Sequence, residues 1–210
     1  MSMSKRWIIN IIDESGSMDG IKHGVIQEYN NFIKYTRESN HDCNVDIRWT
    51  TFFFNDVVRE YQDEQLEHVL NLTPISYRPI NKTALLDAVG TVCNRIISNT
   101  VEYTSICVNI FTDGKENCSS AYTYRSVNDL IGVIKMRNTL ALNFYCTTED
   151  CLDFTKQIPK LDNSFSGSFN ECVKQMSKNS NDFYHLPHGS SISEPSTKRH
   201  KNQPVSLPKT

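Results

Sequence analysis

Three short segments of the chain place oxygen-bearing side chains where they could bind a cation. The first follows an apolar run at 7–12, after which Asp13, Ser15 and Ser17 share one tight turn. Such a run predicts a buried β-strand, so the turn would lie at the carboxyl end of that strand. Ligands of open α/β sheets bind at this edge. A functional site is therefore expected at this edge.

Two later segments have the same kinds of side chain at the same kinds of position. Thr83 opens a helical pattern, where it would also be a good N-cap, and Asp113, followed by Gly114, closes a second apolar run at 106–111. Each segment alone is typical of an ordinary cap or turn. Together they supply hydroxyl and carboxylate oxygens, which Mg²⁺ and Mn²⁺ prefer as ligands. We therefore expect a metal site formed by Asp13, Ser15, Ser17, Thr83 and Asp113.

The mixture of ligand types indicates what such a site would do. Three neutral hydroxyls beside two carboxylates would hold a divalent cation without fully neutralising its charge. The ion would then keep a coordination position for an anionic group from outside. The predicted partner is a protein that supplies an Asp or Glu side chain to the metal.

These motifs resemble the von Willebrand factor A (VWA) domain and its metal-ion-dependent adhesion site (MIDAS). The stretches that are similar lie at 13–18, at 77–79 with 83–88, and at 112–117. The resemblance extends over about 5–178 and is strongest to the small intracellular VWA proteins of bacteria, phages and large DNA viruses. It implies a VWA fold, a bound Mg²⁺ or Mn²⁺ and a role in protein binding.

The resemblance also implies a role for each candidate ligand. Ser15, Ser17 and Thr83 would coordinate the ion directly through their hydroxyls. Asp13 and Asp113 would hold coordinating waters, with a direct bond from either in some ligation states. Water or a carboxylate of the partner would fill a sixth position.

Residues next to the candidate ligands affect the same expectation. Gly16 and Gly114 would permit sharp backbone turns. Lys82 departs from the pattern of similar proteins, which usually have a small residue before the threonine. Its ammonium group could oppose the ion or reach toward an incoming carboxylate, but its long stem can also place it in solvent, which we expect for Lys82 and for Lys115.

The apolar pattern predicts the elements that position these loops. Because predicted strands and helices alternate and the strands are almost continuously apolar, the sheet should be mostly parallel and covered on both faces. We expect an α/β fold, a doubly wound three-layer sandwich with a six-stranded sheet and one short antiparallel edge strand near 57–61. Strands are expected at 7–12, 45–54, 57–61, 106–111 and 140–146, and helices from about 19 and at 64–70, 83–97, 126–138, 150–158 and 168–178.

A change of composition near 179 predicts the end of the domain. Beyond it apolar periodicity is lost, and proline and serine are frequent. A chain of 210 residues can build one sizeable core. We expect one VWA domain over 5–178 and a disordered tail over 179–210.

Composition argues against several classes of protein. The net charge of −2 and the pI near 6.3 disfavour a nucleic acid or a membrane surface as partner. No apolar run approaches the roughly 20 residues that span a bilayer, and the first residues lack a signal-peptide cleavage site. The seven cysteines include no Cys-x-x-Cys pair, which favours free thiols in a reducing compartment. We expect a cytoplasmic monomer, located in a virion or the host cytoplasm if its origin is viral.

Three functions remain open at this point. A metal-dependent protein-binding module is the leading hypothesis, and a structural scaffold that binds no metal is the second. The third is a phosphotransferase, because such enzymes also begin with an Asp after the first strand. They need a second Asp two residues later as acid or base, and Ser15 occupies that position. We therefore expect that the chain is not an enzyme.

Overall fold

Strands and helices alternate along the chain and build one mixed sheet with helices on both faces. A computed structural model describes residues 4–41, 45–99, 103, 105–148, 152–167, 171–172, 174–176 and 178–179. The predicted tail from 180 onward lies outside the described residues. The domain boundary therefore stays a prediction.

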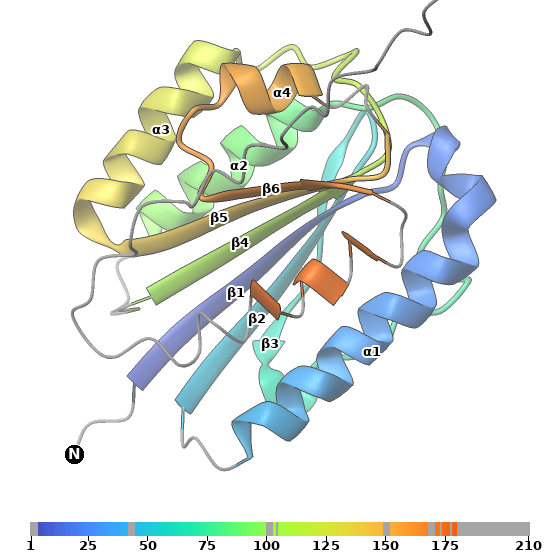
Figure 1. Cartoon of the computed structure of the whole chain (residues 1–210), viewed down its shortest axis with the longest axis vertical. Helices are drawn as coiled ribbons and strands as arrows, with labels where there is room; N and C mark the ends of the chain where they lie inside the picture. Colours follow the sequence, from blue (N-terminus) through green and yellow to red (C-terminus); the bar gives the residue numbers. More distant parts are fainter. Residues whose placement is uncertain are drawn as a thin grey trace, which may run out of the picture.

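The sheet has the predicted six strands, in the order β3-β2-β1-β4-β5-β6 (Figure 1). All neighbouring strands are parallel except β3, which runs antiparallel to β2 at one edge. This arrangement confirms the expected fold class. The strands are β1 (Ser4–Asp13), β2 (Val45–Phe54), β3 (Val58–Gln65), β4 (Ser105–Thr112), β5 (Thr139–Cys146) and β6 (Asn163–Ser166).

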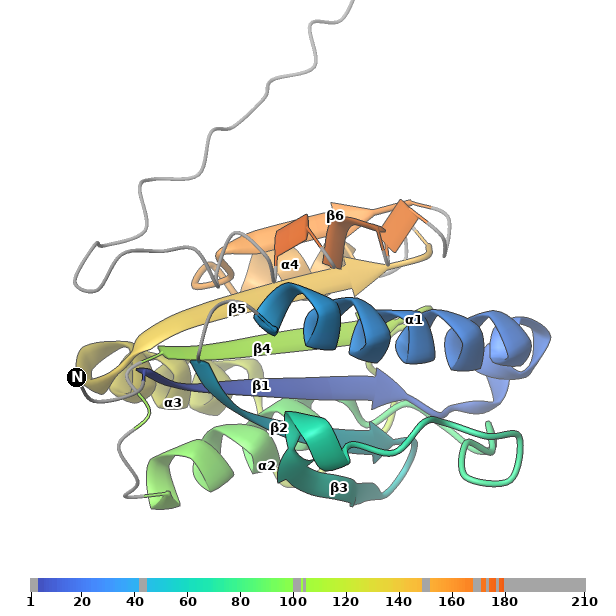
Figure 2. The same ribbon diagram turned by 90° about the horizontal axis from the view of Figure 1, so that it is seen from below.

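The helices form two layers, one on each face of the sheet. Figures 1 and 2 show α2, α3 and α4 on one face and α1 on the other. Each layer buries its own apolar cluster against the sheet, because alternate residues of the strands point to opposite faces. The helices are α1 (Lys22–Asn40), α2 (Leu85–Ser98), α3 (Tyr124–Arg137) and α4 (Leu152–Gln157), with short 3₁₀ helices η1 (Gly16–Ile21) and η2 (Leu66–His68).

Two edge strands differ from the sequence-based expectation. β3 continues to Gln65, through the start of the helix expected at 64–70, and only the three residues of η2 are helical there. β6 was not located from sequence, since Phe165 is its single apolar residue. Both strands lie at edges of the sheet, where little apolar burial is needed and polar side chains hide the alternating pattern.

The cysteines correct one expectation. Cys93, Cys107, Cys118 and Cys172 are free thiols. Cys146 instead takes part in a disulfide, so the expectation of free thiols alone is wrong at this position. The remaining cysteines lie outside the described residues.

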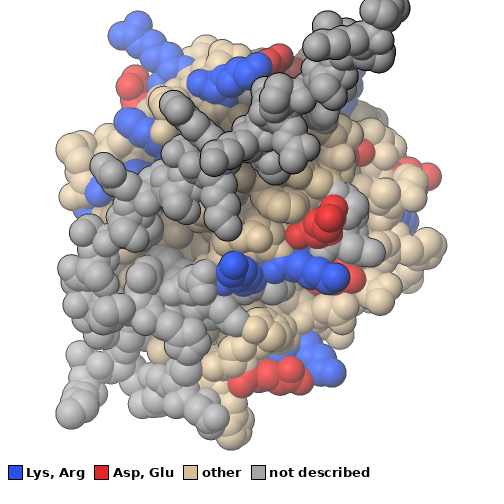
Figure 3. Space-filling model, viewed as in Figure 1, with Lys and Arg blue, Asp and Glu red and all other residues tan. Residues whose placement is uncertain are grey.

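The described surface carries charges of both signs. On the face shown in Figure 3, basic and acidic side chains are interspersed over the described part of the surface. Among the described residues, no helix is both long enough and apolar enough to cross a membrane.

A row of asparagines, three of them buried and the last exposed at the sheet edge, crosses four strands at one level of the sheet. Asn10, Asn109, Asn143 and Asn163 are paired in register on β1, β4, β5 and β6. Their carboxamides form a chain, in which Asn109 Nδ2 donates to Asn10 Oδ1 (3.2 Å), Asn143 Nδ2 to Asn109 Oδ1 (3.0 Å) and Asn163 Nδ2 to Asn143 Oδ1 (2.8 Å). The row favours one register, because a shift by one residue would turn every amide to the other face.

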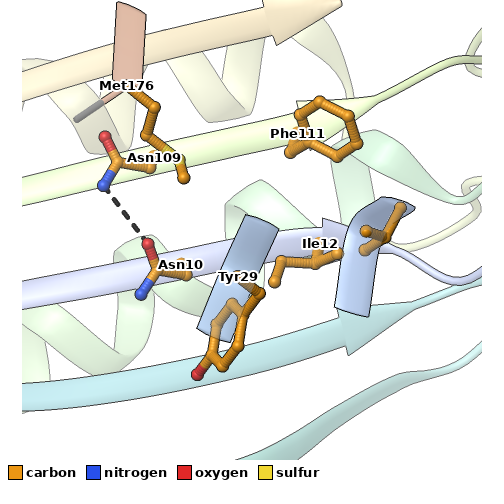
Figure 4. Close-up of a pocket in the computed structure, with 7 residues that line it drawn as sticks. Asn10, Ile12, Tyr29, Asn109, Phe111 and Met176 are labelled. Atoms are coloured by element: carbon orange, nitrogen blue, oxygen red, sulfur yellow. Dashed lines mark hydrogen bonds between the residues drawn. The ribbon is translucent and has the colours of Figure 1, made fainter. Parts of the chain in front are cut away.

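The row ends beside a small apolar cavity under α1. Figure 4 shows the bond from Asn109 to Asn10, with Tyr29 of α1 and Met176 close by. Asn10 Nδ2 makes no hydrogen bond within the described residues. Asn10 lies three residues before Asp13 on β1, so the row fixes the strand from which the first oxygen-bearing loop emerges.

Candidate metal site

The first loop leaves β1 at the carboxyl edge of the sheet, beside the end of β4. Asp13 is the last residue of β1, and its carboxylate folds back to accept a hydrogen bond from Ser15 N at 2.7 Å. This closed turn positions the Ser15 side chain and leads directly into η1. Asp13 and Ser15 are buried, whereas Ser17 is exposed.

The second loop is attached to the first through the backbone. Ile80 N donates to Glu14 O at 2.9 Å, and Gly16 N donates to Asn81 O at 3.1 Å. Asn81 has a φ of 66°, a left-handed conformation that asparagine tolerates better than most residues. This bend brings the chain back so that Thr83 enters the site.

The third loop is attached to the second in the same manner. Asn117 N donates to Thr83 O at 3.1 Å, and Thr83 N donates to the Asn117 side-chain oxygen at 3.0 Å. The three loops therefore form one hydrogen-bonded unit at the carboxyl edge of β1 and β4.

The side-chain oxygens of the five predicted ligands come together in this unit. Ser15 Oγ and Ser17 Oγ lie 3.2 Å apart, and Ser17 Oγ donates to Asp113 Oδ1 at 2.7 Å. A methyl group placed on Gly114 would lie 3.3 Å from Thr83 Oγ1 and 3.8 Å from both Asp13 Oδ2 and Ser17 Oγ. Oxygens from all three loops thus surround one small space.

Gly114 has a different role from the one expected. Neither Gly16 nor Gly114 has a φ in the left-handed region, so a sharp turn does not require glycine at either position. A side chain at 114 would instead occupy the space between the oxygens. Glycine is needed there because it leaves that space open.

Thr83 is also placed differently from the sequence expectation. The N-cap of α2 is Ala84, and no side chain caps the helix from that position. Glu116 of the third loop satisfies the helix instead, accepting from Leu86 N at 2.8 Å. The expected capping role of Thr83 is therefore wrong, and its hydroxyl is directed to the cluster of oxygens.

Burial alters the acidity of both carboxylates. Removal from solvent raises the pKa of Asp13 to about 6, although hydrogen bonds from Ser15 and Thr112 favour its ionised form. Burial likewise raises the pKa of Asp113, against the opposing bond from Ser17. Both groups are poorly solvated as anions, and a nearby cation would stabilise their charged forms.

The donor set fits a hard divalent cation. Within the described residues, no group of three or more His, Cys, Asp or Glu side chains could hold a metal ion. A metal at this edge would depend on the hydroxyls of Ser15, Ser17 and Thr83 together with the two carboxylates. Such all-oxygen sites suit Mg²⁺ and Mn²⁺ better than softer metals.

Glu14 supports the site and was not recognised from sequence. It is only 4% exposed, and its carboxylate accepts two hydrogen bonds from Arg59 of β3, at 2.7 and 3.0 Å. Arg78 N donates to the same carboxylate at 2.6 Å, and the buried Tyr77 donates from its hydroxyl to Asp13 O at 2.6 Å. The sequence indicates only that the stretch at 77–79 is similar to VWA proteins, because its partners Asp13 and Glu14 are 64 residues away.

Lys82 and Lys115 both lie on the surface beside the loops. Their exposure agrees with the expectation that the long side chains extend into solvent.

Comparison with known proteins adds information on the fold. No family model matches the chain, and no curated protein matches its sequence. Solved structures do match. The PilB minor pilin from Streptococcus sanguinis has 12% identity and a TM-score of 0.63, with 86% of this chain and 61% of that chain covered. A von Willebrand factor type A structure from Catenulispora acidiphila has 13% identity and a TM-score of 0.58, with 86% and 43% covered.

A third structure concerns the metal. Proximal thread matrix protein 1 from the mussel byssus, solved with a zinc-occupied MIDAS motif, has 15% identity and a TM-score of 0.58, with 85% of this chain and 46% of that chain covered. This chain spans between 43% and 61% of the lengths of these three proteins. These matches show that the chain has a VWA-like fold.

Proposed function

We propose that the protein is a metal-ion-dependent protein-binding module. The observation that supports this best is that oxygens of Asp13 and Ser17, from the first loop, and of Thr83, from the second, meet around the open space at Gly114 of the third loop. Hydroxyl-rich clusters of this kind suit Mg²⁺ or Mn²⁺, and the zinc-occupied MIDAS motif of the similar mussel protein supports a divalent cation here.

Each residue has a defined part in the proposed site. Ser15, Ser17 and Thr83 coordinate through their hydroxyls, and Asp13 and Asp113 supply the negative charge. Ser15 N and Thr112 hold the Asp13 carboxylate in place. When bound, the ion supplies a positive charge that attracts an Asp or Glu side chain of a partner protein.

The proposal extends to the setting in which the protein acts. We propose a cytoplasmic monomer that binds protein rather than nucleic acid or membrane and that catalyses no reaction. The acidic balance of the chain supports a protein partner over nucleic acid or membrane, and the serine at position 15, where a phosphotransferase would need Asp, supports the absence of catalysis.

Calorimetric titration with MgCl₂ and MnCl₂ tests the metal site. The wild type should bind one ion, and Ser15→Ala should bind it at least about tenfold more weakly, which corresponds to 1.4 kcal/mol. Ser164→Ala is a matched control, because this exposed serine lies on β6 away from the three loops. Absence of binding by the wild type would favour the scaffold alternative instead.

Partner capture tests the second part of the proposal. Asp113→Ala should weaken metal binding and capture of a partner from lysate together, and EDTA should have the same effect on the wild type.

The variant Lys82→Gly distinguishes three roles of the Lys82 side chain. Higher metal affinity would show competition with the ion, weaker partner binding alone would show assistance, and no change would show a solvent role. Capture that survives both EDTA and Asp113→Ala would contradict a metal bridge.

A further inference from the structure

Three aliphatic side chains are exposed on loops next to the candidate metal site. Among the described residues, six large hydrophobic side chains are exposed, and three of them are Val57 (64%), Ile75 (75%) and Ile80 (54%). We call these three residues the aliphatic rim. Val57 belongs to the turn between β2 and β3, and the other two belong to the segment between η2 and α2.

Hydrogen bonds join the aliphatic rim to the loops of the site. Ile80 N donates to the backbone oxygen of Glu14, the residue that follows Asp13. The turn that contains Val57 is bonded to the second loop, because Asn81 Nδ2 donates to Asp56 Oδ1 at 2.9 Å. In Figure 2 the segment between η2 and α2 extends beyond the arrowheads of β1 and β2, on the side where α1 begins.

Hydrogen bonds and a buried side chain hold the segment that carries Ile75. Arg59 pairs with buried Glu14 and also donates to Ser76 O at 2.9 Å, beside Ile75. Tyr77 is fully buried, which anchors the same segment from below. With the backbone bonded on both sides of Ile75 and Ile80, their side chains face solvent rather than the core, and an exposed apolar patch bordered by polar residues is typical of an interaction surface.

The charges near the rim favour an acidic partner. Arg78 and Lys82 are exposed within the same segment, and Lys115 is exposed in the third loop, whereas the exposed carboxylate of Asp56, beside Val57, already accepts a hydrogen bond from Asn81 Nδ2. Basic side chains around a cation site would repel a second cation but attract carboxylates. Charge and apolar surface therefore occur together at this edge.

We propose that the partner presents its metal-binding Asp or Glu within an apolar segment, whose flanking aliphatic side chains pack on Val57, Ile75 and Ile80. The inference rests on the proposed function, because the metal would hold the carboxylate and the aliphatic rim would select its neighbours. Contact at such a rim adds affinity and, more importantly, discriminates among the many carboxylates on protein surfaces.

Two synthetic peptides provide the test. One contains a single aspartate between leucines, and the other contains the same aspartate between serines. In NMR titrations of the full chain with MgCl₂ present, the leucine peptide should bind about tenfold more tightly. It should also shift the methyl resonances of the aliphatic rim, and EDTA should abolish both effects.

Variants identify the surface responsible for the preference. Val57→Ser combined with Ile80→Ser should retain calorimetric Mg²⁺ binding but bind the two peptides equally. Met136→Ser is the control, because Met136 is 81% exposed on α3 and outside the aliphatic rim. That variant should keep the tenfold preference.

The outcomes separate the inference from the function on which it rests. Equal, Mg²⁺-dependent binding of both peptides by the wild type would overturn the aliphatic rim and leave the metal-dependent module intact. Binding of either peptide that persists in EDTA would overturn the metal bridge itself. A third outcome would also overturn the inference. If the protein sediments with phosphatidylserine vesicles only when Val57 and Ile80 are present, and binds the two peptides equally, the aliphatic rim binds a lipid surface.

Discussion

Individual side chains at the site are constrained more by the space between the loops than by their own backbone. Gly114 is the clearest case, because its conformation is ordinary while its missing side chain leaves room between three oxygens. Thr83 is similar, since Ala84 occupies the N-cap position and the Thr83 hydroxyl faces the cluster. Substitutions at these two positions can therefore separate metal binding from folding.

Gly114→Ala should reduce Mg²⁺ affinity without removing any ligand. The added methyl would lie 3.3 Å from Thr83 Oγ1, a tight contact that occupies the space of the ion. We expect a loss of at least about tenfold by calorimetry, with an unchanged circular dichroism spectrum. Gly20→Ala is the control, because a methyl there meets nothing within 4 Å. Equal affinities for the two variants would show that the ion does not occupy this space.

Thr83→Val should weaken metal binding but cost little stability, because the hydroxyl makes no helix cap. Thr123→Val should do the reverse. Thr123 is the N-cap of α3 and accepts a hydrogen bond from Ser126 N in a reciprocal capping box. Its loss should cost about 1 kcal/mol. Calorimetry and urea unfolding measure the two effects, and a large stability loss in Thr83→Val would contradict the assigned geometry.

Among the elements, β3 shows how an edge strand is held by polar contacts. Its Asp63 accepts hydrogen bonds from Arg48 and Thr50 of the neighbouring β2, the second at 2.8 Å, and pairs with Arg95 of α2 at 3.0 Å. Arg48 also stacks on Trp7 of β1, 4.6 Å from the ring centre. A strand sequence with many charges thus remains in the sheet because its carboxylate is satisfied on several sides.

This network predicts a dependence of stability on pH. Burial alone would raise the pKa of Asp63, but the bonds from Arg48 and Thr50 outweigh it and hold the pKa below its ordinary value of 3.8. A carboxyl group with a lowered pKa in the folded state stabilises the fold above its unfolded pKa. That contribution is lost as the pH falls through the folded value.

Asp63→Asn should therefore lower the free energy of unfolding at pH 7 and have a smaller effect near pH 3. Urea unfolding at the two pH values measures the difference. Glu67→Gln is a suitable control, because Glu67 is an exposed carboxylate in η2. A loss of stability in Asp63→Asn that is the same at both pH values would show that ionisation of Asp63 is not responsible.

The central elements and the antiparallel edge strand β3 were predictable from sequence, but the full length of β3 and the whole of β6 were not. Continuous apolar runs such as 7–12 identify strands that are buried on both faces, and the helical spacing after Thr83 identifies α2. β6 could not be found this way, because one phenylalanine among serines gives no period. The five predicted ligands could be listed because each lies next to a recognisable strand or helix. Glu14, by contrast, depends on Arg59, 45 residues away, and no local pattern indicates such a pair.

At the scale of the whole molecule, the site couples parts of the chain that are distant in sequence. Loops that begin after β1, before α2 and after β4 meet at one edge and contact one another through backbone hydrogen bonds. The strand that leads into the first loop contributes to both apolar clusters, through Ile11 on one face of the sheet and Ile12 on the other. An ion bound among the loops would therefore stabilise the native arrangement but not the unfolded chain.

Saturation with Mg²⁺ should raise the thermal midpoint of unfolding. At an ion concentration about 100 times the dissociation constant, linkage predicts about 2.7 kcal/mol of added stability. Thermal melts with MgCl₂ and with EDTA measure the effect. Ser15→Ala should show a much smaller difference between the two conditions, whereas a wild type indifferent to MgCl₂ would argue against the site.

The asparagine row also has a consequence for how the sheet assembles. Asn10 and Asn109 are 99 residues apart in sequence, so their bond can form only once β1 and β4 have joined. The buried carboxamide protons of Asn109 and Asn143 should consequently exchange with deuterium slowly in the native state, and acquire that protection at the moment of strand docking. Each of these two side chains would report the closing of a separate strand boundary, Asn109 that between β1 and β4 and Asn143 that between β4 and β5.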